Sequence, residues 1–237
     1  PAPSLAGAFL ERGTVFRDQE DLKTALADIT SSIKLYQQSS LAFSRRGYIR
    51  LQMKLYDEAI ADFDAAIRLE PNRLDALNRA IAYAAKGSTD IAIQELTTLI
   101  REKSDDADCY YQRGLAYLDK QCYEKSLADF RHVVKLDNKN FNALAHLAFL
   151  LAGMENGTPE TKDEALKWGR LAAMSKDGNE GAQWDALAAA LANADMFDEA
   201  VKASDQAIAQ VQSANEQAAF TMRRDLYKAR KPYRWSS

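Results

Sequence analysis

The two histidines, His132 and His146, are the side chains in this sequence best suited to proton transfer or metal binding near neutral pH. Neither is accompanied by cysteines or acids at the spacing of a zinc site. His132 follows Arg131 on a predicted helix and is expected at the surface. His146 is expected either to pack inside the protein or to contact a ligand.

The two cysteines, Cys109 and Cys122, show no metal-ligand spacing. If residues 110–120 form one helix, the sulfurs lie near its opposite ends, more than about 10 Å apart. That separation is too large for a disulfide, so two unpaired thiols are predicted. Asn156-Gly-Thr158 fits a glycosylation acceptor and is interpreted as a chance match.

The sequence has no phosphate-binding glycine loop, nucleophile elbow or dinucleotide fingerprint. We therefore predict no enzyme, no cofactor, no metal and no small-molecule substrate. One further candidate lies at the end of the chain, where basic residues alternate with aromatic ones, a combination that can bind nucleic acid. The basic residues are Arg223, Arg224, Lys228, Arg230, Lys231 and Arg234, and the aromatic ones are Tyr227, Tyr233 and Trp235. We favour the alternative, a capping helix with a solvated basic face and with aromatics packed on the preceding helices.

Composition limits the choice further. The 237 residues carry a net charge of -3, with 31 basic and 34 acidic side chains, so no global charge favours nucleic acid or an anionic membrane. Glycine (10) and proline (5) are scarce, which favours helix throughout. No apolar run approaches the roughly 20 residues of a membrane span. The chain begins at Pro1 rather than Met, which we interpret as a mature or trimmed chain, so the sequence leaves the compartment open.

Small residues recur along the chain at intervals of 34, 33, 34, 34 and 40 residues. They are Gly13, Gly47, Ala80, Gly114, Ala148 and Ala188. Twelve residues later stands a second small residue in five of the six units: Ala25, Ala59, Ala92, Ser126 and Ala200. In the fifth unit the counterpart is Ala165. Two small residues at this spacing let two helices approach closely where they cross, and large apolar residues surround them at helix-face spacing.

This pattern resembles the tetratricopeptide repeat, in which W-x-x-L-G-x-x-Y is followed by A-x-x-x-F-x-x-A and Pro over 34 residues. The second unit matches it well, with Phe43, Gly47, Ala59, Phe63, Ala66 and Pro71 in register. The resemblance covers nearly the whole chain and implies an all-α solenoid, a right-handed superhelix of six helix-turn-helix repeats. We expect the repeats at about residues 6–39, 40–72, 73–106, 107–140, 141–180 and 181–212.

The repeats lose their pattern toward the end. The fifth carries an insertion, Met154 to Lys162, in which Gly157 and Pro159 predict a loop. Ser213 and Glu216 suggest a capping box that begins a further helix over 213–231, followed by a tail over 232–237. We expect this helix to cover the apolar end of the solenoid. The final Lys231-Pro-Tyr-Arg234 is similar to the end of a group of bacterial tetratricopeptide proteins, which implies a bacterial source.

An arginine precedes the small residue in four repeats, and an acid stands sixteen residues after each arginine. The pairs are Arg12 with Asp28, Arg46 with Asp62, Arg79 with Glu95, and Arg113 with Asp129. The fifth and sixth repeats lack both partners. Because the two features appear and vanish together, we predict structural ion pairs rather than a row of arginines that grips an acidic ligand.

The resemblance implies that the first helix of each repeat lines a concave groove. The phase of the helices places the following candidate binding residues there: Arg17, Arg45, Tyr48, Gln52, Asn78, Ile81, Tyr111, Gln112, Leu115, Asn142, His146 and Phe149. Aromatic side chains and Arg are common anchors of protein interfaces, and amides can bond an extended peptide. The alternative for the aromatics is packing between neighbouring repeats.

One kind of groove can be argued against. The chaperone-binding clamp of the family holds a carboxylate with Lys, Asn and Arg, whereas the matching positions here include Ser44, Tyr48, Leu77 and Ile81. A chaperone-tail ligand is therefore not expected. We predict a non-catalytic scaffold or adaptor that holds a partner protein or peptide in the groove. The alternatives are self-association, which would make a homo-oligomer, and nucleic-acid binding through the basic tail.

Overall fold

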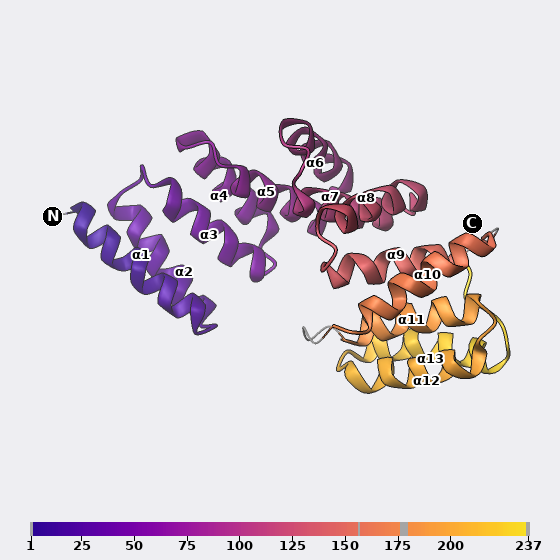
Figure 1. Ribbon diagram of the computed structural model, residues 1–237. Coiled ribbons are helices and arrows are strands. Elements are labelled where there is room, and N and C mark those ends of the chain that lie inside the picture. Colours follow the sequence, from indigo (N-terminus) through magenta and orange to yellow (C-terminus); the bar gives the residue numbers. More distant parts are fainter. Residues whose placement is uncertain (1, 156, 176–179, 236–237) are drawn as a thin grey trace. The chain divides into compact units, whose positions relative to one another are not determined.

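The computed structural model describes residues 2–155, 157–175 and 180–235, and every element in that part of the chain is an α-helix (Figure 1). The thirteen helices have these bounds: α1 Ala2–Asp18, α2 Leu22–Leu35, α3 Ser40–Gln52, α4 Tyr56–Leu69, α5 Arg73–Ala85, α6 Thr89–Glu102, α7 Ala107–Asp119, α8 Tyr123–Leu136, α9 Phe141–Gly153, α10 Pro159–Ala172, α11 Glu180–Asn193, α12 Phe197–Gln210 and α13 Ala214–Lys228. The predicted all-α class of paired helices is confirmed.

The chain forms two compact units, Pro1–Lys120 and Gln121–Ser237. In the first unit α1 packs on α2, α3 on α4 and α5 on α6, and each second helix also packs on the first helix of the next pair. In the second unit α9, α10 and α11 pack mutually, and α11, α12 and α13 follow in order. Such nearest-neighbour packing is what a repeat protein requires.

The small residues lie where the two helices of a pair cross, as predicted. A Cβ atom added to Gly13 would stand 2.7 Å from Cγ1 of Ile29, and one added to Gly47 would stand 2.9 Å from Cε1 of Phe63. Their partners on the second helices, Ala25 and Ala59, are fully buried. The close approach of the helices therefore depends on missing side-chain volume.

The turn between the two helices of a repeat also recurs. Glu20, Lys54, Gly87 and Gln121 all have positive φ, between 56° and 90°, at equivalent positions after a first helix. This left-handed residue closes the helix, and glycine fills the position only at 87. The other three repeats therefore place an ordinary side chain in a backbone region that favours glycine.

The predicted loop over the insertion is too long. α9 ends at Gly153 and α10 already begins at Pro159, so residues 159–162 are helical. Pro159 fits the first helical turn because the backbone N–H it lacks would have no partner there. Thr158 caps the helix by accepting a hydrogen bond from the N–H of Thr161 at 3.4 Å. Asn156 of the acceptor motif lies outside the described residues.

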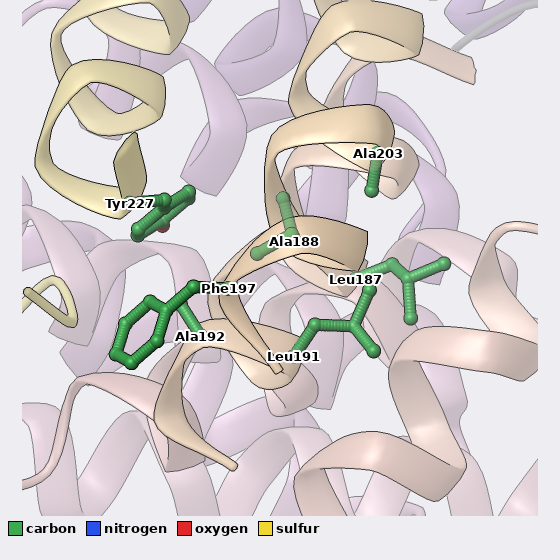
Figure 2. Packing of buried hydrophobic residues seen from close by; sticks show 8 residues of the cluster. Leu187, Ala188, Leu191, Ala192, Phe197, Ala203 and Tyr227 are labelled. Carbon is green, nitrogen blue, oxygen red and sulfur yellow. The ribbon is translucent and has the colours of Figure 1, made fainter. Parts of the chain in front are cut away.

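α13 covers the last repeat. Its Tyr227 is fully buried in a cluster with Leu187 and Leu191 of α11 and Phe197 of α12 (Figure 2). Ser213 caps the helix, as its sequence predicts, by accepting from the N–H of Glu216 at 3.5 Å. Burial of the aromatic side chain shields the apolar end of α11 and α12 from water.

Candidate functional site

The predicted ion pairs are present in the first three repeats. The shortest nitrogen-to-oxygen distances are 2.5 Å for Arg12 with Asp28, 2.7 Å for Arg46 with Asp62, and 2.8 Å for Arg79 with Glu95. Each pair joins the first and second helix of its own repeat. These arginines are therefore neutralised, which supports the structural interpretation over a basic row that binds an acidic ligand.

Aromatic rings hold the guanidinium groups in place. Arg12 lies over the ring of Phe9 at 5.2 Å and Arg46 over that of Phe43 at 5.5 Å, three residues earlier in each case. In the fourth repeat Arg113 lies over Tyr110 and donates to the hydroxyl of Thr97 at 3.1 Å. Its predicted partner Asp129 belongs to the other unit, so this fourth pair stays a prediction.

The candidate groove residues of the first unit lie on α1, α3, α5 and α7. Tyr48 and Gln52 on α3 are exposed. The others are half-buried: Arg17, Arg45, Asn78, Ile81, Tyr111, Gln112 and Leu115. Burial raises the pKa of Tyr111, so its ring is partly enclosed by protein.

Polar contacts link the first helices of the first unit to one another. Arg45 on α3 donates to the hydroxyl of Thr14 and approaches Glu11 at 3.4 Å, both on α1. Ser44 on α3 donates to the buried carboxylate of Asp75 on α5. Arg45 and Ser44 are thus engaged within the protein, and they fix the helix that presents Tyr48.

In the second unit the candidates have different surroundings. Asn142 is exposed near the start of α9. His146 stacks on Phe130 of α8 with ring centroids 4.9 Å apart, and burial lowers its pKa to about 4. Phe149 stacks on Tyr233 at 5.5 Å and meets Trp235 edge-on at 5.1 Å. The tail of the chain therefore covers Phe149.

The basic side chains near the C-terminus have acidic partners from earlier helices. Arg223 pairs with Asp185 of α11 at 2.8 Å, and Arg224 with Asp205 of α12 at 3.0 Å. Arg230 lies 3.8 Å from Asp198. From the sequence alone only Asp225 opposed these charges. The added acids reduce the positive potential that a nucleic-acid site would need.

Sequence reasoning placed the tail aromatics on the last repeat, and this is correct only in part. Tyr233 packs against the α11–α12 cluster, but Trp235 stacks on Tyr123 of α8 at 4.7 Å. The contact of Trp235 with Gly153 was also missed. The available sequence signal was a glycine at the end of an alanine- and leucine-rich helix. With it came two aromatic residues of the tail, Tyr233 and Trp235, separated by a single residue.

The chemistry-bearing side chains form no metal site in the described part of the chain, where no group of three or more His, Cys, Asp and Glu could hold an ion. Both cysteines are free thiols, with Cys109 buried and Cys122 half-buried. Among the described helices, none has the length and apolar character needed to cross a membrane.

Paired helices with small residues at their crossings define a helical-repeat scaffold. Two tetratricopeptide repeat family models match the chain, over residues 40–73 and 107–140, which are the second and fourth predicted repeats. The chain therefore contains tetratricopeptide repeats in these two segments. Proteins built from this repeat typically mediate protein–protein interactions, and both matching models describe a repeat scaffold rather than an enzyme.

Several known proteins are similar. The mitochondrial import receptor subunit TOM70 of Mus musculus is 27% identical over 154 residues, covering 61% of this chain and 25% of the relative. DnaJ homolog subfamily C member 3 of Bos taurus is 24% identical over 220 residues, covering 71% and 43%. The chain thus spans a quarter of the length of the first relative and less than half of the length of the second.

A solved structure of PilF from Pseudomonas aeruginosa superposes with a TM-score of 0.74 at 13% identity. The match covers 93% of this chain and 98% of that one. At this identity the likeness shows the fold alone, so the site has to be argued from the residues of this chain.

Proposed function

We propose that this protein is a non-catalytic scaffold that binds a partner protein or peptide on the face formed by the first helices of the repeats in its first unit. The observation that carries the proposal is the exposure of Tyr48 on α3. Polar contacts hold this helix to α1 on one side and to α5 on the other. Tyr48 is 40% exposed, and its ring offers a large apolar area with a polar hydroxyl at the tip. An amphipathic aromatic side chain on a fixed helix is a typical interface anchor.

The neighbours of Tyr48 favour a protein ligand. Gln52 lies one turn further along α3 and is exposed, and Asn78 and Ile81 lie on the next first helix, α5. Amides can bond the backbone of an extended peptide, while Tyr48 and Ile81 can bury its apolar side chains.

Affinity purification from the source cell, followed by mass spectrometry, tests the proposal. The bait is the full chain, compared with a variant carrying Tyr48→Ala and Gln52→Ala. The matched control is Tyr36→Ala, which removes another tyrosine, 45% exposed, at the end of α2. We expect a partner that is captured by the wild type and the control and lost from the double variant. Retention by all three chains would contradict the proposed face.

A second candidate function, self-association, is favoured by one observation on α1. Val15 occupies the repeat position of Ile49 and Ala82, both fully buried. Ile49 is covered by α2 of the preceding repeat. Val15 is 53% exposed, and so is Leu5 at 51%, which leaves on α1 an apolar surface of the kind that repeats bury.

Light scattering over a range of protein concentrations separates the two candidates. A second copy that packs on α1 predicts a mass that rises with concentration and returns to that of the monomer in Val15→Glu. A monomeric mass throughout would leave partner binding at Tyr48 as the function and remove self-association.

A further inference from the structure

The chain reverses direction after α13 and returns to α9. Arg230 adopts a left-handed φ of 54°, and its N–H and that of Lys231 bond back to the carbonyls of Tyr227 and Leu226 at 2.9 and 3.0 Å. Residues 231–235, here called the tail segment, then run toward the C-terminal end of α9 (Figure 1). The tail segment belongs to the same compact unit as α9.

Three polar contacts fix the tail segment to the last turn of α9. Arg234 donates to the carbonyl of Ala152 at 2.9 Å, and the N–H of Trp235 donates to the carbonyl of Gly153 at 3.2 Å. The indole N–H of Trp235 donates to the carbonyl of Leu150 at 3.2 Å. The last carbonyls of a helix have no partner within it, and their partial negative charge attracts a guanidinium. The end of α9 therefore receives an arginine and an indole.

Aromatic contacts position the two rings of the tail segment. Trp235 stacks on Tyr123 and Tyr233 stacks on Phe149, with centroid distances of 4.7 and 5.5 Å. The guanidinium of Arg223 lies over both Phe149 and Tyr233, at 5.2 and 5.6 Å, and is held there by Asp185. Asp185 and Arg223 are 6% and 11% exposed, so the base of the site is a buried ion pair under an aromatic layer.

Gly153 makes room for the indole. A Cβ atom at this position would stand 2.1 Å from Nε1 of Trp235 and 2.5 Å from its Cε2. A helix end could carry alanine at lower cost in backbone entropy, so the glycine serves the close approach of the ring. The slot for Trp235 is thus defined by Gly153, Phe149 and Tyr123.

The site extends beyond the residues that fill it. An open cleft of about 610 Å³ continues beside Trp235, along Tyr123, Gly153 and Met154. Tyr233, Arg234 and Trp235 are themselves only half-buried. A longer segment could therefore use the same contacts and gain more.

We infer that α8, α9 and α13 carry a recognition site for a short segment of the pattern aromatic–Arg–aromatic, which the tail segment occupies until a partner with the same chemistry displaces it. The inference rests on the proposed function, because it gives the same protein-binding scaffold a second recognition site, which lies within the second unit. The attached tail competes at an effective concentration of about a millimolar, so it selects for partners that bind more tightly than itself.

The test uses the full chain and a fluorescent synthetic peptide of residues 229–237 as the probe. In the variant Tyr233→Ala with Trp235→Ala, the attached tail loses both rings and the site opens. Fluorescence anisotropy should show that this variant binds the probe at least tenfold more tightly than the wild type does. A probe with both aromatics replaced by alanine should not bind.

Gly153→Ala is the matched control, added to the double variant. Its methyl group fills the indole slot while alanine favours the helix, so probe binding should be lost although the thermal melt is kept. Binding unchanged by Gly153→Ala, or equal binding to wild type and double variant, would overturn the inference. So would a folded double variant that fails to bind.

Loss of the cooperative melt in the double variant would also overturn the inference, since a segment needed for folding cannot be displaced by a partner. The proposed function fails separately. A partner captured through Tyr48 would remain whatever the probe does, and probe binding would remain if no Tyr48-dependent partner were found.

Discussion

Arg46 and Asp62 are joined at two points across the helices of one repeat, Nε to Oδ2 at 2.9 Å and Nη2 to Oδ1 at 2.7 Å. Arg50 donates to the same carboxylate at 2.5 Å. The Asp62 side chain is 3% exposed and that of Arg46 14%. In the first repeat Asp28 is buried too, but its partner Arg12 is 60% exposed. The same ion-pair motif therefore occurs once with both partners shielded from water and once with its arginine exposed to water.

We predict that Asp62→Asn lowers the free energy of unfolding by about 3 kcal/mol, because it leaves two partly buried guanidiniums without their anion. Asp28→Asn, the matched control, should cost much less, since Arg12 can be hydrated instead. Urea unfolding followed by circular dichroism measures both. Equal losses in the two variants would show that burial does not decide the strength of these pairs.

The sequence could predict these pairs because the arginine and the acid recur together at a fixed spacing of sixteen residues. It could not predict the additional partners. Asp64 also pairs with Arg79, at 2.6 Å, and Asp106 with Arg73, at 2.8 Å. The acceptor type changes between repeats, since the counterpart of the Arg79–Asp64 contact is that of Arg113 with the Thr97 hydroxyl, so no periodic pattern of acids reveals such partners.

Two glycines on first helices provide a test of the crossing geometry. At Gly47 an added Cβ meets Cε1 of Phe63 at 2.9 Å and Cβ of Asp62 at 3.2 Å, whereas at Gly7 nothing lies within 4 Å. We predict that Gly47→Ala destabilises the protein by about 1–3 kcal/mol through overpacking. Gly7→Ala should stabilise it by up to about 1 kcal/mol through helix propensity. Thermal melts of both variants check the sign, and a gain at Gly47 would contradict the crossing.

The binding face was predictable to a smaller extent than the fold. Helix phase placed Tyr48 and Gln52 on α3, where they are exposed. It also placed Phe149 on the same kind of face, where the chain's own tail covers it. Helix phase reports which side of a helix a residue occupies. It carries no information about a contact between residues far apart in the sequence, such as Phe149 and Tyr233, which are separated by 84 residues. Such a contact depends on where an irregular tail runs.

The two thiols should differ in reactivity. Cys109 is fully buried, and burial raises the pKa of its thiol to about 11, so almost none of it is thiolate at pH 8. Cys122 is half-buried at the start of α8. We predict one rapidly labelled thiol per chain with a disulfide reagent such as DTNB, and a second only after unfolding. Rapid labelling should vanish in Cys122→Ser and persist in Cys109→Ser, and the reverse would contradict the burial of Cys109.

His146 should make the protein less stable in mild acid. It stacks on Phe130, and burial lowers the pKa of its imidazole from 6.5 to about 4. Above pH 6.5 the imidazole is neutral in the folded and the unfolded chain, and the full stability is present. As the pH falls from 6.5 to about 4, the unfolded chain binds a proton that the folded one refuses, which lowers the free energy of unfolding by up to about 3 kcal/mol.

The variant His146→Phe isolates this effect, because phenylalanine keeps a ring against Phe130 and cannot bind a proton. Urea unfolding of both proteins at several pH values gives their free energies of unfolding. The value for the wild type should fall relative to that for His146→Phe between pH 6.5 and 4. Carboxylates whose pKa burial raises, such as Asp75 and Glu95, are shared by the two proteins and cancel in the difference between these values. A difference that stays constant with pH would mean that His146 binds its proton as readily in the folded chain as in the unfolded chain. Its side chain would then be in contact with water and available to a ligand on the face of α9.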